Sequence, residues 1–425
     1  MHLLSKSTYI KGLQCEKALY MTKKHPYLRD KLSVEQRAKF QRGTDVGILA
    51  QQCFPGGVNM SPNSPTQFPK RVQESMANLH NSDINVMYEA VFQFNDTLVM
   101  LDILVRDGQQ WKAIEVKSSL KLSPTYYHDA ALQHYVLHGC GVPLSDFQLM
   151  HLNPDYVKEG PIDVHQLFHT VSVLDYVKEQ EATVAANVER LKNVIAQPHS
   201  PLVKIGSQCH EPYPCDFLGH CWKLVPKTLE LDYKALFAQA PDPKPRSIAY
   251  LNLLMYRPAV PELDGTRPYQ EMVLAFAING NQEPEGHTVW DCFEDHRRWQ
   301  EWLEILKERL SHYELIVCFT PLDLTSLMRH EKLRGQEFGH KVFNLYEVLT
   351  NARFYHPEIK AGYNLKHVMK AIFPDSNLFE HNKILVEANA MELTGYQQAR
   401  EDLVAENEAV AQLYQHFFKN TPVHN

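Results

Sequence analysis

The sequence predicts an α/β protein of two domains joined by a proline-rich linker. Both halves interleave apolar runs that have strand character with runs of helical periodicity. The 425 residues exceed what one ordinary hydrophobic core accommodates. Near residue 240 the prolines are spaced so closely that neither a helix nor an inner strand would tolerate them. We therefore expect a first domain at 1–225, a linker at 226–246 and a second domain at 247–425.

The first domain is predicted to hold a mixed sheet flanked by helices. Residues 6–20 suit a helix, with Ser5 or Ser7 as its N-cap. Residues 33–53 have a helical pattern with a glycine-rich interruption at 42–47. The later pattern predicts strands at 86–94, 97–106, 110–118 and 146–152, and helices at 125–139 and 171–196.

The second domain is predicted to alternate strands and helices as well. Its strands are expected at 248–256, 270–279 and 314–319, and a helix at 293–311. A final helix at 396–419 has charges on one side and Leu403, Val410 and Leu413 on the other. Such a stripe indicates a packing surface or an oligomer surface.

Charge and hydropathy exclude several classes of protein. The net charge of −7 gives no general attraction to nucleic acid, so a nucleic-acid site would have to be a local basic surface. There is no apolar run of eighteen residues and no apolar signal segment at the start of the chain. We expect a cytoplasmic protein with no membrane partner, whose eight cysteines are free thiols or metal ligands rather than disulfides.

Two of the predicted strands form a hairpin that carries acidic residues. Asp107-Gly108 between them is a strong hairpin signal. A two-residue turn there places Asp102 opposite Ala113, so that Glu115 becomes the diagonal neighbour of Asp102 on the same face. Their Cβ atoms would lie roughly 7 Å apart, which suits one cation bridging two carboxylates. A turn of odd length would move Asp102 to the opposite face.

The residues on this face suit metal-dependent hydrolysis. Strand alternation places Glu115 and Lys117 on one face and Val116 on the other. Carboxylates are the ligands that Mg²⁺ or Mn²⁺ prefers, and a bound dication lowers the pKa of a coordinated water. Lys117 can orient that water or stabilise charge on a phosphate, and Glu89 offers a further carboxylate. The alternative is that Asp102 and Glu115 decorate a solvated sheet face.

The order of Glu89, Asp102, Glu115-Val116-Lys117 and Gln133 resembles that of the PD-(D/E)xK nucleases of RecB type. The resemblance implies a restriction-endonuclease-like fold and a nuclease activity on single- or double-stranded DNA. It implies that Asp102 and Glu115 are metal ligands, that Lys117 is catalytic, and that Gln133 positions DNA or the lysine. Many relatives have a metal-ligating histidine after a helical glycine near the N-terminus. The matching stretch, 42–47, has no histidine, and Asp45 is the available substitute.

Four cysteines form a second candidate site. Cys209, Cys215 and Cys221 lie within thirteen residues, and Cys15 is available as a fourth ligand. Four thiolates suit either a [4Fe-4S] cluster or a tetrahedral Zn²⁺, and the spacing alone favours neither. The third interpretation is four buried structural cysteines. A distant first cysteine followed by a clustered trio resembles the iron–sulfur staple of RecB-type nucleases, which implies a [4Fe-4S] cluster here.

Residues 249–385 resemble the second half of an uncharacterised bacterial family in which a RecB-type nuclease is fused to a DnaQ-like, RNase H-like exonuclease fold. The segment 265–270 matches that family. Asn252 and Leu254, however, stand where two metal-binding carboxylates would be, and Asn344 replaces a later aspartate. Two-metal chemistry needs converging carboxylates. We expect this domain to have kept its fold, lost catalysis and retained a surface for nucleic acid or a protein partner.

The function expected from the whole sequence is a metal-dependent DNA nuclease with a [4Fe-4S] cluster, acting in DNA repair or in defence against foreign DNA. One alternative is an inactive nucleic-acid-binding or scaffold protein, because the altered second half shows that catalysis can decay in this chain. The intact Glu115-Val116-Lys117 argues against it. The other alternative is a structural protein stapled by zinc.

Overall fold

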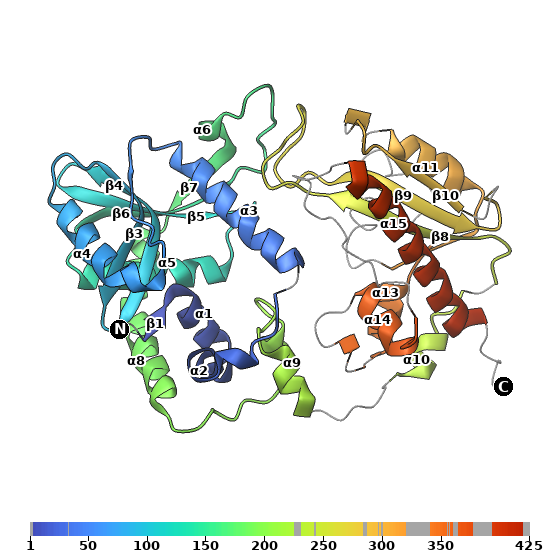
Figure 1. Cartoon of the computed structure of the whole chain (residues 1–425), viewed down its shortest axis with the longest axis horizontal. Coiled ribbons are helices and arrows are strands. Elements are labelled where there is room, and N and C mark those ends of the chain that lie inside the picture. Colours follow the sequence, from blue (N-terminus) through green and yellow to red (C-terminus); the bar gives the residue numbers. More distant parts are fainter. Residues whose placement is uncertain are drawn as a thin grey trace. The chain divides into compact units, whose positions relative to one another are not determined.

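The computed structural model is an α/β protein of two compact units, which confirms the predicted fold class (Figure 1). One unit comprises Met1–Cys221 and Pro258–Gln270, and the other comprises Trp222–Arg257 and Glu271–Asn425. The structure describes residues 3–32, 34–224, 231–241, 244–283, 287–295, 297–298, 301–319, 341–354, 356, 358–359, 364–376 and 393–419.

The boundaries of the units differ from the predicted ones in two ways. Part of the predicted linker is the helix α10 (Tyr233–Phe237), which Asp232 caps and whose Leu236 is fully buried in the core of the second unit. In addition, Pro258–Gln270 packs with the first unit, although we expected all of 247–425 in the second. Ala259 from this segment lies in a core of the first unit. Contacts between residues so far apart in the sequence produce no local pattern from which they could be predicted.

The first unit is built on a mixed seven-stranded sheet with the order β2-β3-β4-β5-β6-β7, in which β1 also pairs with β4. Neighbours from β3 to β5 are antiparallel, β5 and β6 are parallel, and β6 and β7 are antiparallel. The sequence predicted the four long strands closely but not β1, β2 or β7. The strands are β1 (Leu4–Ser5), β2 (Val58–Asn59), β3 (Val86–Phe94), β4 (Thr97–Asp107), β5 (Gln110–Lys117), β6 (Leu144–Leu152) and β7 (Phe168–Ser172).

The helices of the first unit correct three predictions. The expected helix 171–196 is the end of β7 followed by two helices, 174–179 and 181–196. The expected helix 6–20 is two helices, because Cys15 between them has an extended backbone. The expected interruption at 42–47 is wrong, since one helix continues through both of its glycines, each tolerated at a cost of about 1 kcal/mol. The helices are α1 (Lys6–Gln14), α2 (Glu16–Lys24), α3 (Val34–Gln51), α4 (Phe68–Leu79), α5 (Pro124–Gly139), α6 (Val164–Leu167), α7 (Leu174–Glu179), α8 (Glu181–Ala196) and α9 (Leu218–Cys221).

Each face of this sheet has its own hydrophobic core. On one face, side chains of the strands such as Trp111 and Ala113 pack with Leu132 of α5 and Leu191 of α8. On the other face, Ile103, Ile114 and Met150 pack with residues from α3 and from the segment 258–270, namely Val46, Ala50 and Ala259. The sheet is therefore covered on both sides, and the segment 258–270 contributes to the second covering.

Within its described residues, the second unit has a five-stranded sheet with the order β10-β9-β8-β11-β12. Its long C-terminal helix contacts β8 and β9 (Figure 1), and the predicted apolar stripe of that helix is buried within the unit. Of the predicted helix 293–311, residues 296 and 299–300 lie outside the described residues. The elements are β8 (Ile248–Tyr256), β9 (Met272–Gly280), β10 (His287–Asp291), β11 (Leu315–Cys318), β12 (Val342–Asn344), α11 (Trp302–Ser311), α13 (Leu345–Asn351), α14 (Leu365–Ile372) and α15 (Leu393–Tyr414). Across the described ranges, no helix combines the length and apolar character that crossing a bilayer requires.

Candidate functional site

Three carboxylates lie in one row across β3, β4 and β5. The pairing of Ile103 with Tyr88 on one side and with Ile114 on the other sets both registers. When these registers are continued by one residue, Asp102 lies opposite Glu89 and opposite Glu115. Side chains that are directly opposite on antiparallel strands share one face. The row therefore brings together three acids that are far apart in the sequence.

The predicted register of this hairpin was wrong by two residues. Asp107 pairs with Gln110, so the two turn residues are Gly108 and Gln109, and Gly108 has the positive φ of 61° that such a turn favours. Ala113 consequently lies opposite Leu104 rather than Asp102. A shift of two residues preserves strand alternation up to this row, and the charge of Glu115 acts on Asp102, so the two acids lie near each other as predicted.

The regular ladder is interrupted at this row. Glu89 has a left-handed backbone with φ of 54°, which is uncommon for a residue with a side chain. Around it Met87 and Ala90 face the same core, so the alternation of β3 resets at Glu89. In the same row, the Asp102 side chain bonds to the backbone of β5: its Oδ2 accepts a hydrogen bond from the Val116 backbone N–H at 2.6 Å. Backbone departures of this kind concentrate at functional sites.

Two lysines meet Glu115 from different parts of the chain. Lys117 Nζ and Lys6 Nζ each lie 2.7 Å from the same oxygen, Glu115 Oε1. Lys117 also donates to Asp129 Oδ2 from α5, and Lys6 Nζ lies 3.9 Å from that oxygen. We call this group the carboxylate–lysine cluster, and it consists of Glu89, Asp102, Glu115, Asp129, Lys6 and Lys117.

The acids of the cluster have opposed pKa shifts. Burial, reinforced by the charge of Glu115, raises the pKa of Asp102 well above its usual value and also raises the pKa of Glu89. Burial likewise raises the pKa of Asp129. For Glu115 burial acts in the same direction, but the Lys117 and Lys6 ammonium groups outweigh it and lower the pKa. Glu115 is therefore held ionised, while the ionised form of Asp102 is disfavoured until more positive charge is supplied.

Two oxygens of the cluster remain available to a ligand. Glu115 Oε2 and Asp129 Oδ1 are buried and have no hydrogen-bond partner among the described residues. A buried carboxylate oxygen left in this state costs stability, whereas a hard cation would satisfy it. The donor set of carboxylates and the unpartnered oxygens therefore fit a divalent metal such as Mg²⁺ or Mn²⁺.

Of the other two predicted residues, Gln133 lies close to the cluster and Asp45 lies away from it. Gln133 is fully buried one helical turn after Asp129 in α5, and its amide oxygen and nitrogen have no partner within the described residues. It shares a helix face with Asp129, and within the described part of the chain it makes no hydrogen bond to Lys117. Asp45 is exposed on α3, accepts a hydrogen bond from Gln41 at 2.9 Å and does not join the cluster.

Lys6 and Asp129 were missed by the sequence analysis. Asp129 had a usable signal, because it precedes Gln133 by four residues in a helix that was correctly predicted. Lys6 had none, since a lysine at the start of an amphipathic helix is ordinarily solvated. Only the parallel pairing of β1 with β4 brings the start of α1 to the central strands.

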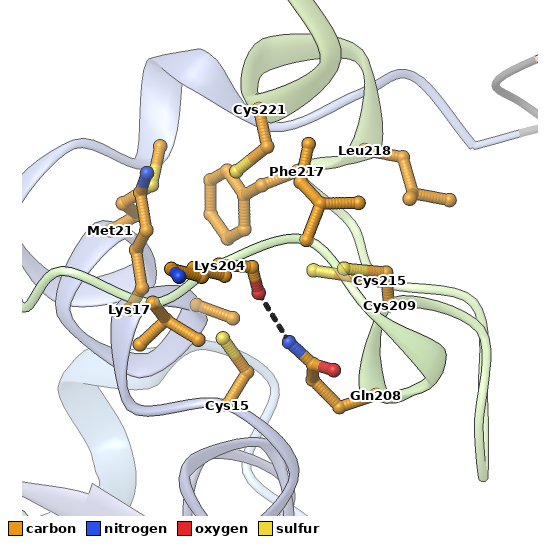
Figure 2. Close-up of a pocket in the computed structure, with 13 residues that line it drawn as sticks. Cys15, Lys17, Met21, Lys204, Gln208, Cys209, Cys215, Phe217, Leu218 and Cys221 are labelled. Carbon is orange, nitrogen blue, oxygen red and sulfur yellow. Dashed lines mark hydrogen bonds between the residues drawn. The ribbon is translucent and has the colours of Figure 1, made fainter. Parts of the chain in front are cut away.

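The four predicted cysteines line one pocket, and Figure 2 shows their sulfur atoms turned toward it. Cys15 comes from the break between α1 and α2, and the other three come from the segment 207–221. The side chain of Gln14 joins these parts by donating to the carbonyl oxygens of Gln208 at 2.8 Å and Tyr213 at 2.6 Å. Burial and the neighbouring cysteines raise the pKa of Cys215 to about 11. All eight cysteines are free of disulfides, and Cys53, Cys140, Cys292 and Cys318 lie outside this pocket.

Neither site has a preformed coordination shell. In the described part of the chain, no three His, Cys, Asp or Glu side chains already stand at metal-binding geometry. The candidate ligands are thus identified by the residues that come together and by their unsatisfied atoms.

In the second unit the amides that replace expected acids have structural partners. Asn252 Nδ2 donates to Glu406 Oε2 of α15 at 2.6 Å, and Asn344 caps α13 by accepting a hydrogen bond from Tyr346 N at 3.1 Å. Burial raises the pKa of Glu406 to about 7, assisted by the neighbouring Asp402 and opposed by the Asn252 hydrogen bond. This half-buried acid was not foreseen in the sequence.

Comparisons with known proteins do not assign this chain to a family. No protein-family model matches it, and no curated protein is significantly similar to it. Among solved structures, one described as "Crystal structure of SSO0001" is 12% identical, with 47% of this chain and 77% of that chain covered and a TM-score of 0.20. A likeness at that TM-score assigns neither a fold nor a function.

Proposed function

We propose that the first unit is a metal-dependent nuclease that hydrolyses phosphodiester bonds of DNA, as its resemblance to the PD-(D/E)xK nucleases of RecB type implies. The observation that carries the proposal is the row of the half-buried Glu89 and Asp102 with the buried Glu115, to which Lys117 is bonded. Asp102 and Glu115 would hold Mg²⁺ or Mn²⁺. Such a bound ion supplies an activated water and neutralises developing charge.

The residues of the chain have distinct tasks in this proposal. The Val116 N–H fixes Asp102 Oδ2, which leaves Oδ1 as the oxygen able to face a cation. Lys117 is held by Glu115 and Asp129, and its Nζ lies 5.1 Å from the centre of the Tyr126 ring. A cationic group fixed in this way can stabilise the negative charge that builds on a phosphate during hydrolysis. Glu89 provides an additional carboxylate beside Asp102.

We assign the cysteine pocket a [4Fe-4S] cluster, with Zn²⁺ as the alternative occupant. Four thiols from two distant segments fit either, and the resemblance to RecB-type nucleases favours the cluster. Its role would be structural, because the ligands join Cys15 to the segment 207–221 and close a long loop. Such a site belongs in a reducing compartment, which agrees with the expected cytoplasmic location.

The second unit is proposed to be an RNase H-like domain without catalysis. Asn252 and Asn344 serve as structural hydrogen-bonding groups where carboxylates would be required. The unit would then contribute by binding DNA or a protein partner, in DNA repair or in defence against foreign DNA.

A second candidate is a nucleic-acid-binding scaffold that does not cut. Glu115 Oε1 is already bonded by two ammonium groups, and a buried network of this kind also occurs as a purely structural feature. Metal-dependent cleavage separates the two candidates.

The test is a cleavage assay with full-length protein purified without oxygen. Labelled single- and double-stranded DNA with free or blocked ends would be incubated with Mg²⁺ or Mn²⁺. We expect cleavage by the wild-type protein and by Lys192→Ala, a control in α8 whose Nζ lies 3.2 Å from Asp96. Lys117→Ala should retain its circular dichroism spectrum and lose cleavage. Equal cleavage by Lys117→Ala would overturn the assignment, and DNA binding without any cleavage would favour the scaffold.

A further inference from the structure

Lys6 enters the carboxylate–lysine cluster from outside the sheet. It is the first residue of α1, which Ser5 caps by accepting a hydrogen bond from Thr8 N while Ser5 N donates to Thr8 Oγ1. From there its side chain reaches Glu115 Oε1 at 2.7 Å. Lys6 and Lys117 therefore bond one and the same oxygen and leave Glu115 Oε2 unsatisfied among the described residues.

The two lysines are held with different strength. Lys117 has short contacts to both Glu115 and Asp129, approaches the Tyr126 ring and is 13% exposed. Lys6 has a short contact to Glu115 alone, with Asp129 at 3.9 Å, and is 28% exposed. Of the two ammonium groups, Lys6 is therefore the one that can leave the cluster with the smaller loss of contacts.

The charges of the cluster indicate which kind of ligand would replace the Lys6 ammonium group. Four carboxylates face two ammonium groups, so the formal negative charge exceeds the positive charge by two. Exchanging Lys6 for one divalent cation would reduce that excess from two to one. A cation bound to Glu115 would also repel a nearby ammonium group, and this repulsion is strong where water is largely excluded.

We propose that Lys6 is the internal counter-ion of the cluster: it bonds Glu115 in the metal-free protein and withdraws its side chain when one divalent cation binds. The inference rests on the proposed function in one respect, namely that the cluster binds a divalent cation. It makes Lys6 a positioning residue, which holds the Glu115 side chain in place before the metal arrives.

The surrounding structure allows the side chain to move while its backbone stays. At the far end of α1, Gln14 donates to the carbonyl oxygens of Gln208 and Tyr213, and Lys11 pairs with Asp216. These contacts fix the helix to the segment that carries three of the cysteines. The four methylenes of Lys6 provide the necessary reach, and its partial exposure provides a route to solvent.

The experiment is a calorimetric titration of Mg²⁺ into full-length protein, which needs no cleavage. Lys6→Met removes the competing charge and keeps the length of the side chain, so we expect Mg²⁺ to bind about tenfold more tightly. Lys6→Arg keeps the charge and should bind Mg²⁺ as the wild-type protein does. Lys192→Met is the matched control, a partly exposed lysine with carboxylate partners elsewhere, and should also bind as the wild type.

Thermal unfolding provides the second readout. Without metal, Lys6→Met should melt at a lower temperature than the wild-type protein, and the addition of Mg²⁺ should raise its melting temperature by more. If Lys6→Met does not fold, Lys6→Gln replaces it in both measurements. Unchanged or weaker Mg²⁺ binding by the variant, in a wild-type protein that binds Mg²⁺ and cuts DNA, would overturn the role of Lys6 alone. No Mg²⁺ binding by the wild type would overturn both proposals.

Discussion

The Val116 backbone N–H donates a hydrogen bond of 2.6 Å to Asp102 Oδ2. This bond crosses from β5 to β4 at the row where Glu89 interrupts the ladder. It orients an acid whose ionised form is disfavoured by burial and by the charge of Glu115. Holding such an acid in place with an unusual backbone geometry lowers the stability of the fold at this point. A local loss of stability of this kind is characteristic of a site that binds a ligand.

Asp102→Asn should therefore stabilise the metal-free protein while abolishing cleavage. The amide oxygen can still accept the Val116 hydrogen bond, and no charge remains to be buried. Because the folded pKa of Asp102 lies above its unfolded value of 3.8, the wild-type carboxyl loses stability as the pH rises beyond that value. The advantage of Asp102→Asn should thus grow from about pH 4 toward neutral pH.

The measurement is thermal unfolding at several pH values without divalent metal, together with the cleavage assay. Asp155→Asn is the control, because that carboxylate is exposed and only distantly paired with Arg267. A melting temperature for Asp102→Asn below that of the wild type at neutral pH would contradict the assignment of a strained metal ligand.

The meeting of the two acids of the hairpin could be predicted although its register could not. Side chains alternate between the faces of a strand, so an error of two residues in the register does not change which side chains share a face. The turn lies at Gly108-Gln109 instead of Asp107-Gly108, and that difference changes the pairing by two residues. Asp102 and Glu115 consequently lie near each other. Cys15 and the later cysteine trio were likewise predicted to meet, because their arrangement resembles the iron–sulfur staple of RecB-type nucleases, and the four thiols do line one pocket.

Other parts of the site depend on contacts that no local pattern reports. Lys6 is brought to Glu115 by a two-residue strand, β1, that is too short to produce a periodic signal. The segment 258–270 lies beyond the predicted linker and yet packs on the first unit, where Gly265 N donates to Lys158 O at 2.8 Å. Single-sequence reasoning assigns such a segment to its neighbours in the chain.

Cys215→Ala should destabilise the first unit and remove its bound metal. Cys215 lies in the pocket with the other three cysteines, and its N–H donates to Cys209 O at 2.9 Å, so the loss of one ligand loosens the entire segment. Anaerobically purified wild-type protein should contain iron and absorb visible light, whereas the variant should contain little iron and be cut sooner by protease.

Cys140→Ala is the matched control for this experiment. Cys140 is also partly buried in the first unit, but its sulfur contacts Gln93 O rather than another cysteine. Zinc in place of iron in the wild-type protein would select the alternative occupant. An unchanged melting curve and metal content for Cys215→Ala would contradict a metal site in this pocket.

Tyr269→Phe should weaken the attachment of the segment 258–270 and slow cleavage. The Tyr269 hydroxyl donates to Ser118 O at 2.6 Å, and Ser118 directly follows Lys117. Loss of one such hydrogen bond costs about 1 kcal/mol, and it frees the end of β5 that carries the lysine. Denaturant unfolding and cleavage rates would measure both effects. Tyr233→Phe, at an exposed tyrosine of α10, should change neither, and equal behaviour of the two variants would argue against a supporting role for the segment.

Glu406→Gln should change how the stability of the second unit depends on pH. Burial raises the pKa of Glu406 to about 7 from an unfolded value of 4.5, so the folded unit keeps a proton that the unfolded chain has released. Stability therefore falls as the pH rises from about 4.5 to 7 and remains lower above that.

Glutamine cannot ionise, and its side-chain oxygen can still accept the hydrogen bond from Asn252. Relative to the wild-type protein, Glu406→Gln should thus gain stability across this pH window, by at most about 3 kcal/mol for the size of the shift. Denaturant unfolding at pH values on either side of the window measures the gain. Glu401→Gln, an exposed acid on the same helix that accepts a hydrogen bond from Gln397, should follow the wild-type curve. A pH-independent difference between Glu406→Gln and the wild type would mean that Glu406 is ionised throughout, and that α15 packs on β8 with a buried charge rather than with a neutral acid.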